Sequence, residues 1–110
     1  MFTKQTNEID ISIDEFKEKY AEVPGVVIDV RTQEEYEEGH LLKTDKQLDL
    51  MNGEFKESLS ELDIDKTYYL YCRTGNRSGQ AARMMKSEGF ENVYNVGGFN
   101  DLARAGFETE

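Results

Sequence analysis

A chain of 110 residues has the length of one domain, and its 13 basic and 23 acidic residues give a net charge of −10. This balance excludes general nucleic-acid binding, which needs a basic surface, and we interpret it as a solubilising charge. The single cysteine excludes a disulfide within the chain and is compatible with a reducing compartment, so we expect a cytoplasmic protein. Residues 1–5 lack the apolar run of a signal peptide, and no stretch reaches the length of a membrane span, so no membrane association is expected.

Short apolar runs alternate with helix-like stretches, a pattern typical of a mainly parallel sheet with helices on both faces. In chain order, we expect a strand at 8–11, a helix from 12 to the break at 24–25, a strand at 26–30 and a helix from 32 to 39. A weak strand at 47–50 and a short helix at 55–62 follow. The last part of the chain is expected to form a strand at 67–71, a helix from 77 to 88, a strand at 92–96, a turn at 97–98 and a helix at 99–105. Two capping boxes, Ser12 with Glu15 and Thr32 with Glu35, mark the first two helix starts. The sequence therefore predicts a single α/β domain over residues 1–110 with about five strands.

Cys72 stands where a buried strand ends and the clearest predicted helix begins. Parallel sheets bind ligands at this edge, and the helix N-terminus, with two nearby arginines, would stabilise a negatively charged sulfur. Gly75 permits a backbone conformation that turns amide groups toward one point. A lone cysteine in an apolar strand is more often a small core residue, but a purely structural loop would not need so many polar groups. The candidate loop residues that follow the thiol are Arg73, Thr74, Gly75, Asn76, Arg77 and Ser78.

Two thiol chemistries suit such a loop. Phosphate-ester hydrolysis through a cysteinyl-phosphate uses Cys-x5-Arg, in which the arginine stands six positions after the cysteine and grips the phosphoryl oxygens. Here the sixth position is Ser78 and the arginine is Arg77, at the fifth position, so the ring is one residue too short. Sulfur transfer fits the tighter ring better, because a sulfane sulfur is anionic and smaller than a phosphoryl group.

Three ordered blocks resemble a known family. Cys72 to Ser78 resembles the active-site loop of a single-domain rhodanese. Asp29-Val30-Arg31, followed by Gly39-His40-Leu41, resembles the family's N-terminal signature, and residues 93–99 with 105–107 resemble its C-terminal signature. Together the blocks span roughly residues 26–107 and imply a single rhodanese-like domain.

The chain departs from the family pattern at three places. Residues 42–46 replace the usual Pro-Gly-Ala continuation after the Gly-His pair, which makes the third strand and its register uncertain. Leu102 stands where the family usually has tryptophan, and Glu108 stands near the place of a usual proline. These changes concern packing and the rim of the site more than the cysteine loop.

The resemblance implies a thiosulfate sulfurtransferase in which Cys72 accepts a sulfur atom from a small anionic donor, thiosulfate or a persulfide. Cys72 then carries the sulfur as its own persulfide and passes it to cyanide, a thiol or a protein. The backbone amides from Arg73 to Ser78 would hold the persulfide anion. Arg73 would bind an anionic donor such as thiosulfate, although a solvated surface arginine is an equal alternative. For Arg77 we favour a structural bond to a carboxylate over donor binding.

Asp29 and Arg31 end a neighbouring strand, so we expect them at the same sheet edge as supporting residues. Asp29 would accept hydrogen bonds from the cysteine loop or pair with an arginine. His40, the only histidine, could form a dyad with the cysteine, but the family signature favours a structural role. One cysteine and one histidine are too few soft ligands for a metal, and no cofactor is expected.

Two other functions stay open. The domain could be a sulfur carrier or binding module with a protein acceptor and little turnover of small molecules. A cysteine phosphatase or arsenate reductase is a third alternative, which the short loop disfavours. The sequence leaves open the physiological donor and acceptor, the pathway and the oligomeric state, and a monomer is compatible with it.

Overall fold

Four parallel strands form the central sheet, in the order β2-β1-β3-β4. The structure is a computed structural model that describes residues 9–110. The strands are β1 (Val26–Asp29), β2 (Lys46–Gln47), β3 (Tyr68–Cys72) and β4 (Val93–Gly98). The chain runs from β1 outward to β2, then crosses back to β3 and continues outward to β4. The strand order therefore reverses between β1 and β3, and the carboxyl ends of these two strands flank the crevice where such sheets bind ligands.

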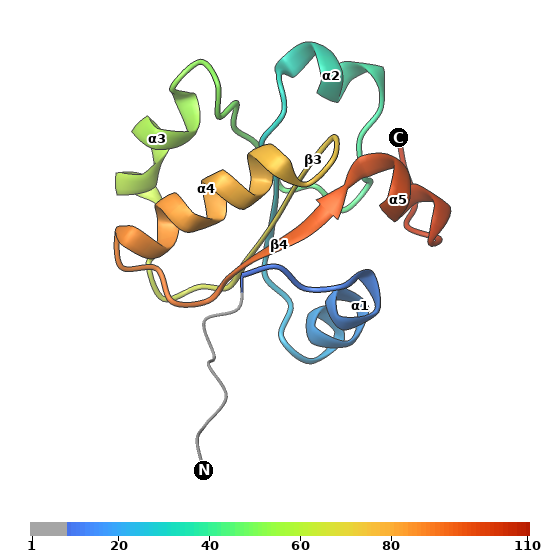
Figure 1. The fold of residues 1–110 in the computed structure, drawn as a ribbon, viewed down its shortest axis with the longest axis horizontal. Helices are drawn as coiled ribbons and strands as arrows, with labels where there is room; N and C mark the ends of the chain where they lie inside the picture. The colour runs from blue at the N-terminus through green and yellow to red at the C-terminus, as the bar shows by residue number, and fades with distance from the viewer. Residues whose placement is uncertain (1–8) are drawn as a thin grey trace.

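Helices cover both faces of the sheet (Figure 1). The helix α4 (Asn76–Ser87) packs on one face with α3 (Glu54–Ser58) and the 3-10 helix η1 (Leu59–Glu61). The helices α1 (Ile13–Glu22) and α5 (Phe99–Arg104) pack on the other face. The short helix α2 (Gln33–Glu38) follows β1. None of these helices, which together cover the helical part of residues 9–110, is long and apolar enough to cross a lipid bilayer.

The strand that carries Cys72 is buried along its whole length. Its side chains alternate between two hydrophobic clusters, because successive residues of a strand point to opposite faces of the sheet. Tyr68, Leu70 and Cys72 join the cluster beneath α4, whereas Tyr69 and Tyr71 join the cluster beneath α1 and α5. The end of β3 is thus held from both faces, which fixes the position of the thiol.

The predicted α/β class, with a parallel sheet and helices on both faces, is confirmed, and both predicted capping boxes are present. The prediction of about five strands was wrong by one. Of the first predicted strand, residue 8 lies outside the described residues, and Asp10 forms only an isolated parallel bridge with Asn95. The chain cannot pair further because Ser12 already caps α1. The weak third strand is shorter than predicted, with only Lys46–Gln47 paired.

The predicted turn at residues 97–98 is also corrected, because β4 continues through Gly98 and α5 begins at the next residue. Gly98 is needed for a close approach rather than for a turn. A Cβ at this position would lie 2.4 Å from the carbonyl oxygen of Arg73. The absence of a side chain therefore lets β4 pass directly beside the cysteine loop.

Candidate active site

The sulfur of Cys72 lies at the centre of a ring of hydrogen-bond donors. Its Sγ accepts hydrogen bonds from the amide of Gly75 at 3.0 Å and the amide of Ser78 at 3.4 Å, and the Ser78 hydroxyl lies 3.3 Å away. Gly75 has φ +98°, a left-handed conformation that a residue with a side chain adopts only under strain, and it caps α4. The start of α4 thus directs its free amides toward the thiol, as expected for an anion site.

The donor ring changes the acidity of the thiol. Burial raises the pKa of Cys72, but the hydrogen bonds from the Ser78 hydroxyl and from the amides of Ser78, Gly75 and Thr74 outweigh burial, so that the pKa lies below its usual value. A cysteine that only filled a core would have apolar surroundings and a raised pKa. Cys72 is completely buried and packs in the core, yet its polar surroundings favour the reactive thiolate form.

A single carboxylate ties the cysteine loop to α2. Glu35 accepts two hydrogen bonds from the Arg77 guanidinium, at 2.9 and 3.0 Å, and one from Arg73 at 3.3 Å. The same side chain closes the capping box with Thr32. Arg77 is therefore turned toward α2 instead of over the sulfur, where a cysteine phosphatase would need its arginine. Arg73 remains largely in solvent, with a side chain that is 63% exposed.

Replacing Glu35 by glutamine is expected to destabilise the protein by about 2 kcal/mol at neutral pH, because Arg77 loses a charged partner. Hydrogen bonding from Arg77 is the main cause that lowers the pKa of Glu35 well below its usual range. A lowered folded-state pKa gives stability that is complete above the unfolded-state pKa of about 4.3 and is lost as the pH falls toward the folded-state value. The difference in unfolding free energy between wild type and Glu35→Gln should therefore shrink below about pH 4.

Urea unfolding of both proteins at neutral and acidic pH measures this difference. Glu34→Gln is the matched control, since Glu34 is exposed in the same helical turn. The control should change stability by less than about 0.5 kcal/mol at every pH. If the loss of unfolding free energy caused by Glu35→Gln stays constant between pH 7 and pH 3, the charge of the Glu35 carboxylate contributes nothing to stability.

Asp29 and Arg31 form a buried ion pair beside the cysteine loop. The side chain of Arg31 is 5% exposed, and both oxygens of Asp29 accept hydrogen bonds from its guanidinium, at 2.7 to 3.1 Å. Arg31 also donates to the carbonyl of Gly39 and lies over the rings of Phe99 and Tyr71. Of the two partners expected for Asp29, the structure provides an arginine and not the cysteine loop.

His40 lies away from the thiol. Its Nδ1 is 2.9 Å from the carbonyl oxygen of Tyr36, its ring stacks on the Tyr36 ring at 3.7 Å, and its Nε2 is 3.7 Å from a carboxylate oxygen of Glu110. These contacts belong to the packing of α2 against the end of the chain. The geometry gives His40 no part in a dyad with Cys72.

The side chains of Thr74 and Asn76 point away from the sulfur. Both residues are exposed, the Thr74 hydroxyl faces the amide of Asn76, and the Asn76 carboxamide accepts a hydrogen bond from Gln80. Their contribution to the donor ring is therefore the backbone, while Ser78 alone directs a side-chain group at Cys72.

Comparison with known proteins identifies the family. The family model of the Rhodanese-like domain matches residues 12–105. The chain belongs to the rhodanese-like family. Its sequence is 35% identical over 78 residues to the thiosulfate sulfurtransferase PspE of Escherichia coli, covering 69% of this chain and 72% of PspE. It is 36% identical over 88 residues to "Putative sulfur carrier protein YrkF" of Bacillus subtilis, covering 79% of this chain and 46% of that protein.

Solved structures agree with this assignment. The structure described as rhodanese with anions from E. coli superimposes with a TM-score of 0.66 and 30% sequence identity, covering 77% of this chain and 95% of that chain. This chain spans less than two thirds of the length of several curated relatives that it matches, YrkF among them.

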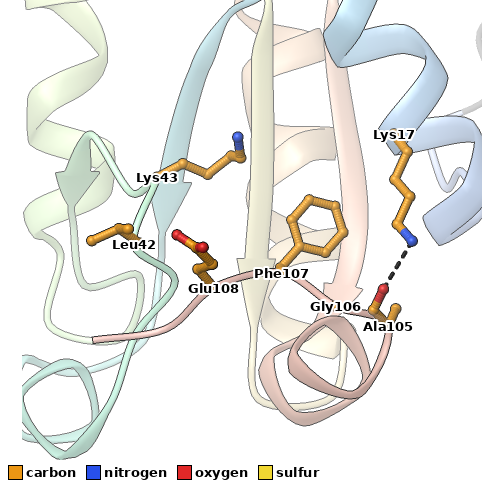
Figure 2. Close-up of a pocket in the computed structure, with 7 residues that line it drawn as sticks. All are labelled: Lys17, Leu42, Lys43, Ala105, Gly106, Phe107 and Glu108. Carbon is orange, nitrogen blue, oxygen red and sulfur yellow. Dashed lines mark hydrogen bonds between the residues drawn. The ribbon is translucent and has the colours of Figure 1, made fainter.

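Two pockets of the rhodanese-like domain differ in their relation to Cys72. A pocket of about 190 Å³ borders the cysteine loop through Arg73 and is also lined by Arg31, Glu35 and Phe99. A pocket of about 300 Å³ lies elsewhere and shares no residue with the loop (Figure 2). There Lys17 donates a hydrogen bond to the carbonyl of Ala105, and its Nζ lies 5.7 Å from the centre of the Phe107 ring. Of these two pockets, only the smaller one borders the cysteine loop.

Sequence reasoning missed two residues of this site. Glu35 was recognised only as part of a capping box, and nothing local indicates that its free oxygen lone pairs would bind Arg77, 42 positions away. Asn95 lies in the interior of β4, where the sequence shows only a polar residue within an apolar strand. A polar residue among the apolar residues of a strand was the one available signal that Asn95 binds a buried polar partner.

Proposed function

We propose that this rhodanese-like domain is a sulfurtransferase that moves a sulfane sulfur from an anionic donor such as thiosulfate to a thiophilic acceptor through a persulfide on Cys72. The observation that carries the proposal is the donor ring, in which the amides of Gly75 and Ser78 converge on a buried Sγ. We also propose that the protein works in the cytoplasm without a cofactor.

The reaction has two balanced steps. The Cys72 thiolate attacks the sulfane sulfur of thiosulfate, a new S–S bond forms at Sγ, and sulfite leaves with the electrons of the broken S–S bond. The acceptor then attacks the outer sulfur of the persulfide, the new S–S bond breaks, and Cys72 leaves again as a thiolate. With cyanide as acceptor, the product is thiocyanate.

The loop supports both steps through its backbone. Negative charge on the thiolate or persulfide is stabilised by fixed amides that need no reorganisation during the reaction. A short ring suits a single sulfur atom, and the Arg77–Glu35 pair keeps the loop in this form. Arg73, the exposed arginine at the edge of the adjoining pocket, is the cation available to an incoming anion.

Arg73→Ala is expected to raise the KM for thiosulfate about tenfold and to change kcat by less than about threefold, since one charged contact to the donor is lost. Steady-state kinetics at varied thiosulfate concentration measure this. Arg104→Ala, which removes an exposed arginine from α5, is the control and should leave KM unchanged. If Arg73→Ala and the wild-type protein have the same KM, Arg73 is a solvated surface residue that does not bind the donor.

A sulfur carrier with a protein acceptor is the second candidate, favoured by the similarity to YrkF. Thiocyanate formation from thiosulfate and cyanide tests the first function, and transfer from the persulfurated domain to a protein thiol tests the second. Rapid thiocyanate formation supports an enzyme that acts on small-molecule substrates, whereas sulfur transfer only to the protein thiol supports a sulfur carrier. A protein that does neither contradicts both.

A further inference from the structure

Asn95 of β4 has a carboxamide whose orientation is fixed by four contacts. Its Oδ1 accepts a hydrogen bond from the Ser78 hydroxyl at 2.6 Å and from the Gly97 amide at 3.1 Å. Its Nδ2 donates to the Gly75 carbonyl at 3.0 Å and to an Asp10 carboxylate oxygen at 2.8 Å. An amide N–H only donates and a carbonyl only accepts, so turning the carboxamide over would break both backbone contacts. Asn95 therefore presents an acceptor, and not a donor, to Ser78.

The Ser78 hydroxyl has one hydrogen and two acceptors within reach. Asn95 Oδ1 lies 2.6 Å from its oxygen on one side, and Cys72 Sγ lies 3.3 Å away on the other. The hydroxyl can fill only one of these positions at a time. When Sγ is a neutral thiol, the hydroxyl hydrogen goes to the shorter contact with Asn95, and the Ser78 oxygen is free to accept from the thiol.

The balance changes when the sulfur is charged. A hydrogen bond to an ionised acceptor is about twice as strong as a neutral one, so a Cys72 thiolate draws the hydroxyl hydrogen away from Asn95. Asn95 Oδ1 still keeps its bond from the Gly97 amide, so the buried carboxamide oxygen is never left without a partner. The move costs only a rotation about one bond of Ser78.

We propose that Asn95 is a positioning residue that offers the Ser78 hydroxyl a second acceptor, so that this hydroxyl bonds to the sulfur of Cys72 only while that sulfur is charged. The inference rests on the proposed use of Cys72 as a nucleophile. In the reaction, Sγ is charged before it attacks the donor and again when it leaves the persulfide. In the persulfide itself the charge lies on the outer sulfur, and the hydroxyl returns to Asn95.

Other charged and titratable groups lie on the elements around the loop. The substitutions Asn95→Leu and Ser78→Ala leave all of these groups in place. The groups comprise Arg73 of the loop, Arg77 of α4, Glu35 of α2, Asp29 at the end of β1, Arg31 after β1, Asp49 after β2, Tyr71 of β3 and Asp10 beside β4.

A double-mutant cycle on the thiol pKa tests the proposal, with thiolate ultraviolet absorbance as the measurement. Asn95→Leu removes the acceptor that stabilises the neutral thiol state, so it should lower the pKa of Cys72 by about 0.5 to 1. Ser78→Ala removes the hydroxyl and should raise this pKa. In the Ser78→Ala background, Asn95→Leu should leave the pKa unchanged. An equal effect of Asn95→Leu in both backgrounds, or a raised pKa, would overturn the proposal.

A second measurement needs no change at Asn95 and covers a variant that fails to fold. The side-chain amide resonances of Asn95 should shift in NMR spectra as Cys72 titrates in the wild-type protein, because Oδ1 loses the Ser78 hydrogen. The shift should be largely absent in Ser78→Ala. Resonances that stay constant through the wild-type titration would contradict the inference. Thiocyanate formation is recorded in parallel. Its absence would contradict the proposed function, whereas its presence with constant Asn95 resonances would contradict only the proposed movement of the Ser78 hydroxyl.

Discussion

The Cys72→Ser variant is expected to lose thiosulfate-to-cyanide transfer by at least about a thousandfold while remaining folded. A serine hydroxyl ionises far less readily than a thiol and cannot form the S–S bond on which both steps depend. The cost in stability should be about 1 kcal/mol, since the new hydroxyl can still accept the hydrogen bonds of Gly75 and Ser78. Initial rates of thiocyanate formation and thermal unfolding measure the two quantities.

These two readouts separate a reactive thiol from a packing residue. Cys72 has no exposed surface and lies among core side chains, so a purely structural cysteine would show its effect in unfolding. Retention of a tenth or more of wild-type turnover in a folded Cys72→Ser protein would contradict the covalent mechanism. A large loss of stability with proportionate loss of activity would make Cys72 a core residue.

Asp29→Asn should have the largest effect on stability, about 3 to 5 kcal/mol. The substitution preserves shape but leaves the buried Arg31 guanidinium without its anionic partner. The remaining bond from Arg31 to the Gly39 carbonyl cannot replace a carboxylate that binds through both oxygens. Urea unfolding at neutral pH measures the change in unfolding free energy.

Asp101→Asn is the matched control for this prediction. It removes the carboxylate from the ion pair of Asp101 with Arg104, whose side chains are 62% and 72% exposed. Solvent screens such a pair, so the control should cost less than about 0.5 kcal/mol. Equal costs for the two variants would show that burial of the Asp29–Arg31 pair adds nothing to its contribution.

Local patterns in the sequence predicted most of the architecture. The two capping boxes placed the starts of α1 and α2, because each uses residues only three positions apart. The buried run before Cys72 and the polar run after it placed the thiol between a strand and a helix, as the structure has it. These features depend on neighbours in the chain, which a sequence displays directly.

The remaining features depend on contacts between distant segments. Residues 9–11 form a bridge where a strand was predicted, because the cap of α1 ends the pairing with Asn95. Gly98 was interpreted as part of a turn, whereas the nearby Arg73 carbonyl makes a side chain there impossible. The tie between Glu35 and Arg77 likewise appears only when α2 and the cysteine loop meet at the sheet edge. The sequence favoured a bond from Arg77 to a carboxylate, but it did not indicate that this carboxylate is Glu35.

The most direct test of the central claim is the intact mass of the protein after incubation with thiosulfate. The proposed mechanism predicts an added mass of about 32 Da, one sulfur atom, that maps to Cys72, and its loss on addition of cyanide together with formation of thiocyanate. Thiocyanate formation by a protein that never carries this adduct, or an adduct that cyanide cannot remove, would contradict sulfur transfer through a Cys72 persulfide.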